Sequence, residues 1–246
     1  MSTRPTSSGL SVVTASILAL GLALAGWLAG HGFMKGRTSD RYVTVKGVAE
    51  RAVEADVALW PLRFVAADDD LGAAQKRIAE DTARVMVFLE ENGIPAEQVS
   101  VQGLEVTDQA ANPYRSGPYT NRFIVAKSLM IRSDDPHRIL AASQKVGNLV
   151  DAGVVLSSQG GPAQGPTYLF TRLNEHKPEM IAEATAAARE AAEQFAADSG
   201  SDLAGIRTAN QGVFVIRARD RAPGISEESQ LEKTLRVVST IDYLLE

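Results

Sequence analysis

The chain has 246 residues, of which 45% are hydrophobic and 22% charged, a balance that excludes a disordered protein and allows one or two domains. Its net charge is −5: three of its 25 basic residues and none of its 30 acidic ones precede residue 38. The remainder is therefore acidic and offers no basic surface to phosphate, so we exclude nucleic acid as a partner. The absence of cysteine excludes disulfides, thiolate metal sites and cysteine nucleophiles.

An uncharged, apolar run occupies residues 10–30 near the N-terminus. As a helix it spans about 30 Å, which matches the hydrocarbon core of a bilayer. Trp27 lies near one end, where an indole prefers the interface, and a polar, basic stretch follows. The run therefore predicts a single transmembrane anchor at 10–30, with a cytoplasmic N-terminus at 1–9 and a linker at 31–40.

A cleaved signal peptide is the alternative interpretation of the same segment. Arg4 supplies a minimal basic start, and residues 23–25 (Ala-Leu-Ala) form an A-x-A-like cleavage site. Apolar residues continue past this site through Trp27 to Phe33, and that length favours an uncleaved anchor. The heavier basic flank follows the segment, which argues mildly for a cytoplasmic C-terminus, although this rule is weak for large translocated domains.

The rest of the chain repeats one pattern, in which two strand-like runs precede a helix three times and two more runs follow. Apolar alternation predicts strands at 42–46, 56–66, 98–106, 122–132, 153–158, 167–173, 206–216 and 234–245. Cap and stop residues predict helices that begin at Asp68–Asp70, at Asp135-Pro136 and near Pro178, with ends at Asn92-Gly93 and, for the last, Gly200. This order indicates an α+β fold, with antiparallel sheets covered on one face by helices in a repeated β-β-α order.

Three local features add expectations about this fold. Pro61 in the second strand implies an edge position or a bulge. The Gly/Pro-rich residues 159–166 predict a hairpin that joins the strands on either side of them. The last helix is rich in alanine, and its buried face is predicted to contain Ile181, Ala184, Ala188, Ala191 and Phe195.

Several strings add to the order of these elements. The string VTVKGVAERAVEADVAL contains Gly47, Glu50 and Asp56 at the spacing of a strand, a Gly-x-Gly-Glu turn and a strand that opens on Pro-Asp. Ala49 and Ala55 stand where that pattern has its second glycine and its proline. Together with ENGIPAEQVSVQGLEV, NRFIVAKSLMIR and the alanine-rich helix, the string resembles the SIMPL-domain family of YggE-like exported bacterial proteins.

The resemblance covers about residues 41–246, which we therefore expect to form a SIMPL-like α+β domain. It implies export, so we expect a single-pass protein of the inner membrane with this domain in the periplasm or outside the cell. It also implies ring-like or larger homo-oligomers and a loose connection to envelope stress. The family offers no catalytic residue to carry over, and we transfer none.

The motifs predict no catalytic, metal or cofactor site, and hence a protein that is not an enzyme. His31, His137 and His176 lie outside metal-ligand spacings such as H-x-x-x-H, and no G-x-S-x-G elbow is present. The acidic run Asp68–Asp70 lacks the alternation of a calcium loop. Residues 160–166 lack the Lys-Ser/Thr of a phosphate loop.

One segment, the loop at 109–120, carries aromatic and basic residues that are expected to be exposed: Tyr114, Arg115 and Tyr119. Loops often carry function, so an alternative to self-assembly is a module that uses this loop to bind an envelope ligand, peptide or glycan. An ordered hairpin tip without a ligand is the plainer interpretation. A cryptic hydrolase is a third hypothesis, and it requires a clustered histidine–carboxylate pair in a pocket.

Overall fold

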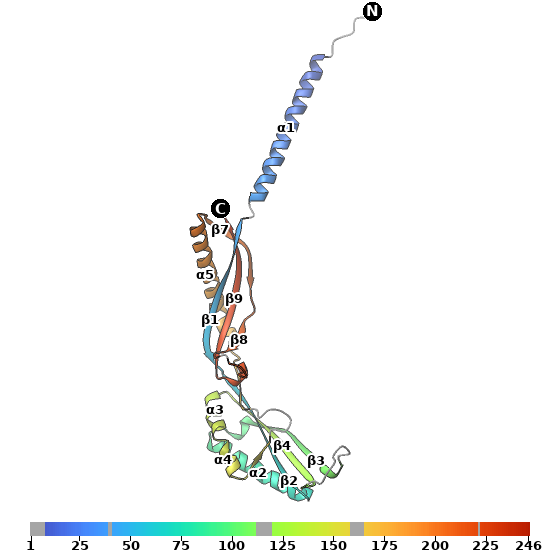
Figure 1. Cartoon of the computed structure of the whole chain (residues 1–246), viewed down its shortest axis with the longest axis vertical. Coiled ribbons are helices and arrows are strands. Elements are labelled where there is room, and N and C mark those ends of the chain that lie inside the picture. Colours follow the sequence, from blue (N-terminus) through green and yellow to red (C-terminus); the bar gives the residue numbers. More distant parts are fainter. Residues whose placement is uncertain (1–7, 39–40, 112–119, 158–164, 221) are drawn as a thin grey trace, which may run out of the picture. The chain divides into compact units, whose positions relative to one another are not determined.

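The computed structural model describes residues 8–38, 41–111, 120–157, 165–220 and 222–246, and it has an α+β fold with antiparallel sheets (Figure 1). Its α helices are α1 (Ser8–Thr38), α2 (Leu71–Glu91), α3 (Pro136–Gln144), α4 (Gly147–Asp151) and α5 (Leu173–Ser199). Its strands are β1 (Tyr42–Glu54), β2 (Val57–Asp68), β3 (Val99–Asp108), β4 (Phe123–Ser133), β5 (Val155–Leu156), β6 (Thr167–Leu169), β7 (Leu203–Gln211), β8 (Val215–Ala218) and β9 (Glu232–Leu245). Short 3-10 turns lie at Ala96–Gln98, Gln109–Ala111 and Glu227–Ser229.

The chain divides into two compact units, and β1, α5 and β9 each contribute residues to both. The first unit contains Met1–Val48, Ala182–Gly212 and Val238–Glu246. The second contains Ala49–Ile181 and Val213–Val237.

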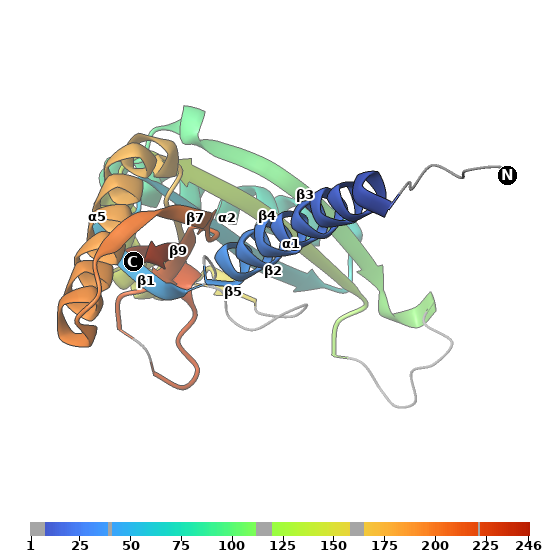
Figure 2. The ribbon, with the colours of Figure 1, turned by 90° about the horizontal axis from the view of Figure 1, so that it is seen from above.

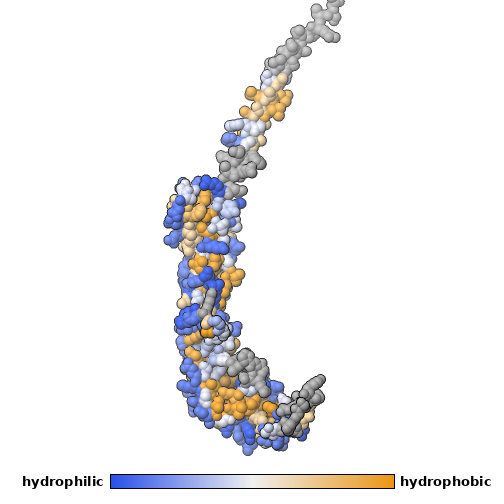
Figure 3. All heavy atoms as spheres, viewed as in Figure 1, coloured by the Kyte–Doolittle hydropathy of each residue, from blue (hydrophilic) through white to orange (hydrophobic). Residues whose placement is uncertain are grey.

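Helix α1 contains the apolar run that the sequence predicts as an anchor. Its segment Thr14–Gly32 is long and apolar enough to cross a membrane, and a signal sequence has the same character. The side chains at 14–32 are exposed, and Figure 3 shows a cluster of apolar residues there. The helix continues to Thr38, through most of the predicted linker, because residues 31–38 contain no proline to interrupt the backbone hydrogen bonds.

The second unit is built on a sheet with the strand order β3-β4-β2-β5, in which β6 also pairs with β2. Both Figure 1 and Figure 2 show β2, β4 and β3 side by side, with β3 outermost. Pro61 lies in β2, which is a central strand, so the predicted edge position is wrong for the strand as a whole.

The side of β2 away from β4 is paired only at residues 57–59 and 64–65. Pro61 lies between these two paired stretches, so its missing N–H breaks no hydrogen bond to a described strand on that side.

The predicted hairpin across residues 159–166 is also wrong. The strands on either side, β5 and β6, pair with β2 at different positions and not with each other. Strands this short gain more from extending an existing sheet than from an isolated two-stranded ribbon.

Helices α2, α3 and α4 pack on one face of this sheet. Asp70 caps α2 by accepting a hydrogen bond from the N–H of Ala73 at 2.8 Å, and Asp135 caps α3 in the same way. The core between the sheet and the helices includes alternate residues of β2 and the inner faces of the helices: Trp60, Leu62, Phe64, Ile78, Val85, Leu89, Ile139 and Leu149. The period of two along β2 places these residues on a single side of the sheet.

In the first unit, α5 packs closely against β1. Gly47 makes this approach possible, since a Cβ atom there would lie 1.8 Å from the backbone oxygen of Ala184. The buried line of α5 is Met180, Ala184, Ala188, Ala192 and Ala196. The predicted face was therefore wrong at Ala191, which is exposed, and at Phe195, which is 49% exposed.

The predicted strand at 206–216 is two strands, since β7 ends before Gly212 and β8 begins after it. The N–H of Gly212 donates to the carbonyl of Val238 at 2.8 Å, and a Cβ atom at Gly212 would lie 2.6 Å from that oxygen.

The buried Lys233 holds the charged loop after β8 in place. Its ammonium group donates hydrogen bonds to the carbonyl and to the carboxylate of Glu227.

Candidate interaction surfaces

The predicted binding residues Tyr114, Arg115 and Tyr119 lie outside the described residues. The base of their loop is described, and it is well anchored. Arg122 forms an ion pair with Asp108 at 2.9 Å, and this hydrogen bond holds the pKa of Asp108 below its ordinary value. The side chain of Gln109 is largely buried and donates to the carbonyl of Asn121 at 3.0 Å. The ends of the loop are therefore fixed to the tip of the β3–β4 pair.

The histidines have three separate environments. His31 stacks on Trp27 within α1. His137 lies 3.1 Å from the carboxylate of Glu54, and both side chains are more than half exposed. His176 lies against the ring of Phe170 and 3.4 Å from Arg51.

Arg51 also forms an ion pair with Glu179 at 2.5 Å and thereby lowers the pKa of that carboxylate. The His137–Glu54 pair lies open to solvent, where water screens its charges. Within the described part of the chain, no three His, Asp or Glu side chains gather as metal ligands.

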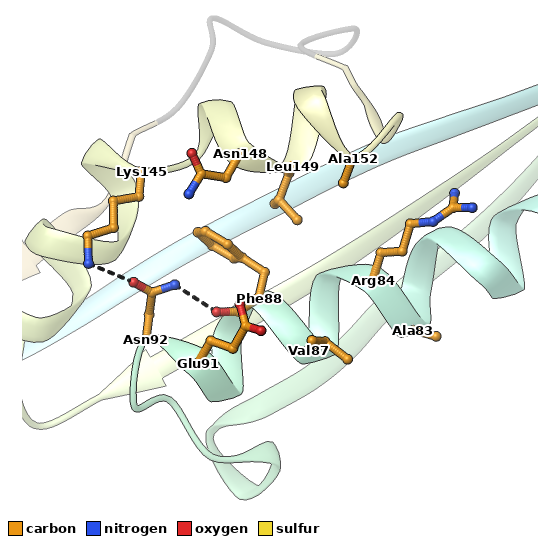
Figure 4. Close-up of a pocket in the computed structure, with 10 residues that line it drawn as sticks. All are labelled: Ala83, Arg84, Val87, Phe88, Glu91, Asn92, Lys145, Asn148, Leu149 and Ala152. Atoms are coloured by element: carbon orange, nitrogen blue, oxygen red, sulfur yellow. Dashed lines mark hydrogen bonds between the residues drawn. The ribbon is translucent and has the colours of Figure 1, made fainter.

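A groove of about 570 Å³ lies between the last turns of α2 and helix α4 (Figure 4). Its floor is apolar and includes the buried side chains of Phe88 and Leu149. Lys145 lies at one end and donates to the side-chain oxygen of Asn92 at 3.2 Å. Arg84 lines the groove too, and it is paired with Asp81 at 2.7 Å. A groove of this size and lining has room for a small apolar group beside a polar one.

The free edge of β3 carries a row of exposed apolar side chains. Among the strands that the structure describes, only β4 pairs with β3. Val101, Leu104 and Val106 are 63%, 56% and 45% exposed. These three residues pair with β4 residues whose side chains lie on the helix-bearing face of the sheet, so their own side chains lie on that face too. Helix α2 packs on β2 and β4 and leaves the three side chains uncovered. Such an edge combines unpaired backbone groups with apolar side chains.

Sequence reasoning identified β3 as a strand but missed its value as a surface. The alternation of Val99 and Val101, resumed at Leu104 and Val106, indicates a strand with one apolar face. It does not say whether a neighbouring element covers that face. The pairing of β3 with a single strand, which depends on residues distant in sequence, decides this.

Fold and surfaces together define a class: an α+β protein with antiparallel sheets, preceded by an apolar helix long enough to span a bilayer. The family model named SIMPL, described as a protein of unknown function (DUF541), matches residues 43–240, so the chain belongs to the SIMPL family. This confirms the resemblance seen in the sequence. A comparison with curated proteins gives no match.

Proposed function

We propose that this SIMPL protein is a non-enzymatic scaffold that α1 holds in a membrane and that self-associates outside the cytoplasm. The observation that carries the proposal is the exposed apolar surface of α1. Its side chains at positions 17, 18, 20, 22, 24 and 28 are all large aliphatic groups that are more than half exposed. Each gains about 1.5–3 kcal/mol on leaving water, so a bilayer is the environment that best accommodates this helix.

Placement of the folded part outside the cytoplasm is supported by the family, which the resemblance associates with export. The acidic folded part has no basic surface that would favour a cytoplasmic nucleic-acid partner. The basic flank after the apolar run argues weakly in the opposite direction. Topology is therefore the first property to measure.

Self-association is supported by the uncovered edge of β3. A scaffold role in place of catalysis is supported by the open position of the His137–Glu54 pair. General acid–base catalysis works best where burial and neighbouring charges adjust a pKa toward neutrality.

Fusion of a reporter that is active only outside the cytoplasm to the C-terminus of the full chain tests anchor and topology together. We expect an active reporter, an intact mass and retention in the membrane fraction after alkaline extraction. A matched variant with Leu20→Arg and Leu24→Arg should lose both activity and membrane retention. An inactive reporter would contradict the orientation, and a mass reduced by the first 25 residues would contradict the anchor.

The alternative function is a module that binds an envelope ligand through the loop at 109–120. The fixed base of this loop favours it, because the Asp108–Arg122 pair and Gln109 present the loop from a rigid support. Replacement of Tyr114 and Tyr119 by alanine should release a partner captured by the full chain. The control is Tyr42→Ala, which removes an exposed tyrosine elsewhere. Retention of the partner by the loop variant would reject this alternative.

A further inference from the structure

The edge of β3 has a pattern of side chains that is complementary to itself. Pairing with β4 is regular except at Gln102, where one extra residue interrupts the register between Val101 and Gly103. Because of this bulge, the residues on the helix side are Val99 and Val101 before it and Leu104 and Val106 after it. All four are aliphatic.

Two copies of β3 can pair in antiparallel fashion about a two-fold axis perpendicular to the sheet. In such a pair, a residue of one copy lies opposite a residue of the other copy when their two residue numbers add up to one fixed total. The two side chains then lie on the same face of the sheet. A sum of 205 sets Val101 against Leu104 of the second copy and Val99 against Val106. In this register each of the four aliphatic residues lies opposite another aliphatic residue. The register is possible only because the bulge at Gln102 shifts the alternation of side chains between the two faces by one residue.

The polar residues of β3 fit the same register. On the other face, Glu105 lies opposite Ser100 of the second copy. The acids of like sign that this register brings opposite each other are Asp108 and Glu97, and Glu97 lies before the start of β3. Glu105 is already engaged by Arg63 of its own chain at 2.7 Å, and Asp108 is engaged by Arg122. The two acids therefore do not act as the unpaired charges that protect many edge strands.

The strand β7, an edge of the other sheet, lacks these properties. Its pairing with β9 is irregular at two places. Ile206, at 50% exposed, is its one large aliphatic residue with high exposure, and the residues from 207 to 211 are polar except for Ala209. A second copy thus finds apolar complementarity at β3 and not at β7.

We propose that two copies of this chain join through antiparallel pairing of their β3 strands, with Val101 opposite Leu104 of the second copy. The result is one continuous sheet with the helices of both copies on the same face. The inference rests on the proposed self-association and specifies its interface. Contact between the exposed aliphatic side chains and new backbone hydrogen bonds stabilise the pair.

Disulfide trapping tests this register, since the chain has no cysteine of its own. Full-length Val101→Cys and Leu104→Cys chains carrying different tags are produced together in membranes and oxidised mildly. Opposed residues lie within the Cα separation of less than about 7 Å that a disulfide requires. We expect a cross-linked dimer containing both tags. Val101→Cys alone should give little dimer, because its two copies are offset along the strands by three residues.

Ile206→Cys mixed with Val101→Cys provides the matched control at an exposed aliphatic position on the other edge. Mixed cross-linking of Val101→Cys with Leu104→Cys no stronger than this control overturns the inference. A cross-link to a protein of different mass likewise overturns it, because the edge then serves another partner. Sedimentation of the unmodified chain in detergent distinguishes failure of the β3 interface from failure of self-association. If the chain is an oligomer but the cross-link does not form, only the β3 interface is rejected. If the chain is a monomer, self-association is rejected as well.

Charge exchange gives a second measurement that does not depend on oxidation. Val101→Lys places a charge opposite Leu104 of the second copy and should weaken the dimer about tenfold, as for loss of two cross-strand pairs. Mixing it with Leu104→Glu sets opposite charges against each other and should restore association. Both sites are exposed in the single chain, so unfolding midpoints measured at concentrations where the chain is monomeric should stay unchanged. Absence of weakening in Val101→Lys, or of recovery in the mixture, contradicts the register.

Discussion

At the scale of single residues, the carboxylate of Asp56 is held in place by three hydrogen bonds. It accepts hydrogen bonds from the N–H of Thr171 at 2.8 Å, from the hydroxyl of Thr171 at 2.9 Å and from Arg172 at 3.1 Å. Partial burial works to raise the pKa of Asp56, but these donors together outweigh it and lower the pKa below its ordinary value of 3.8. The carboxylate thus ties the start of β2 to the segment that precedes α5.

A depressed pKa in the folded state means that Asp56 stabilises the fold above the ordinary value of 3.8, and that this stability is lost as the pH falls through the folded pKa. We expect Asp56→Asn to lower the free energy of unfolding at pH 7 by about 1.5–3 kcal/mol. The difference from the natural chain should narrow below pH 4. Urea unfolding at several pH values measures both effects. Asp134→Asn, at an exposed acid, is the control, and a difference that does not change with pH would contradict this role.

At the scale of elements, α5 shows how an alanine-rich helix acquires one specific buried face. Its apolar residues are mostly alanine, so hydrophobicity differs little around the helix and the sequence periodicity is weak. The close approach of β1 at Gly47 selects the line through Ala184, Ala188 and Ala192. A side chain larger than alanine on that line meets backbone or tightly packed neighbours.

Two neighbouring alanines of α5 separate the buried face from the predicted one. Ala192→Leu should destabilise the protein by about 1–3 kcal/mol, because its added atoms enter the packed contact with Val43 and Val45. Ala191→Leu adds the same atoms at an exposed position and should change stability by less than about 0.5 kcal/mol. Chemical denaturation of both variants makes the comparison, and equal losses would show that the face is placed wrongly.

At the scale of the whole molecule, the role that we propose for α1 is to fix the location of the protein and not to stabilise its fold. Its side chains at 14–32 are exposed, and none of them belongs to either hydrophobic core. We expect a chain that starts at residue 38 to move from the membrane fraction to the soluble fraction. Its urea midpoint should correspond to a stability within about 0.5 kcal/mol of the full chain. A large loss of stability on truncation would show that α1 belongs to the fold.

The sequence by itself determined several local features of this protein. Helix boundaries at Asp70 and Asp135 followed from cap chemistry, and the apolar run in α1 followed from composition and length, since both depend on neighbours along the chain. The α+β fold with antiparallel sheets followed from the order of the elements. The family followed from the spacing of several short strings.

The tertiary structure alone decided which surfaces are covered. It placed Pro61 in a central strand, separated β5 from β6, rotated the buried line of α5 to Ala192, and left Val101 and Leu104 at an uncovered edge. Each of these outcomes depends on which distant segments meet, and the alternation of apolar residues along one strand carries no information about its neighbours. Local propensity fixed the elements, and long-range packing fixed the surfaces that they present.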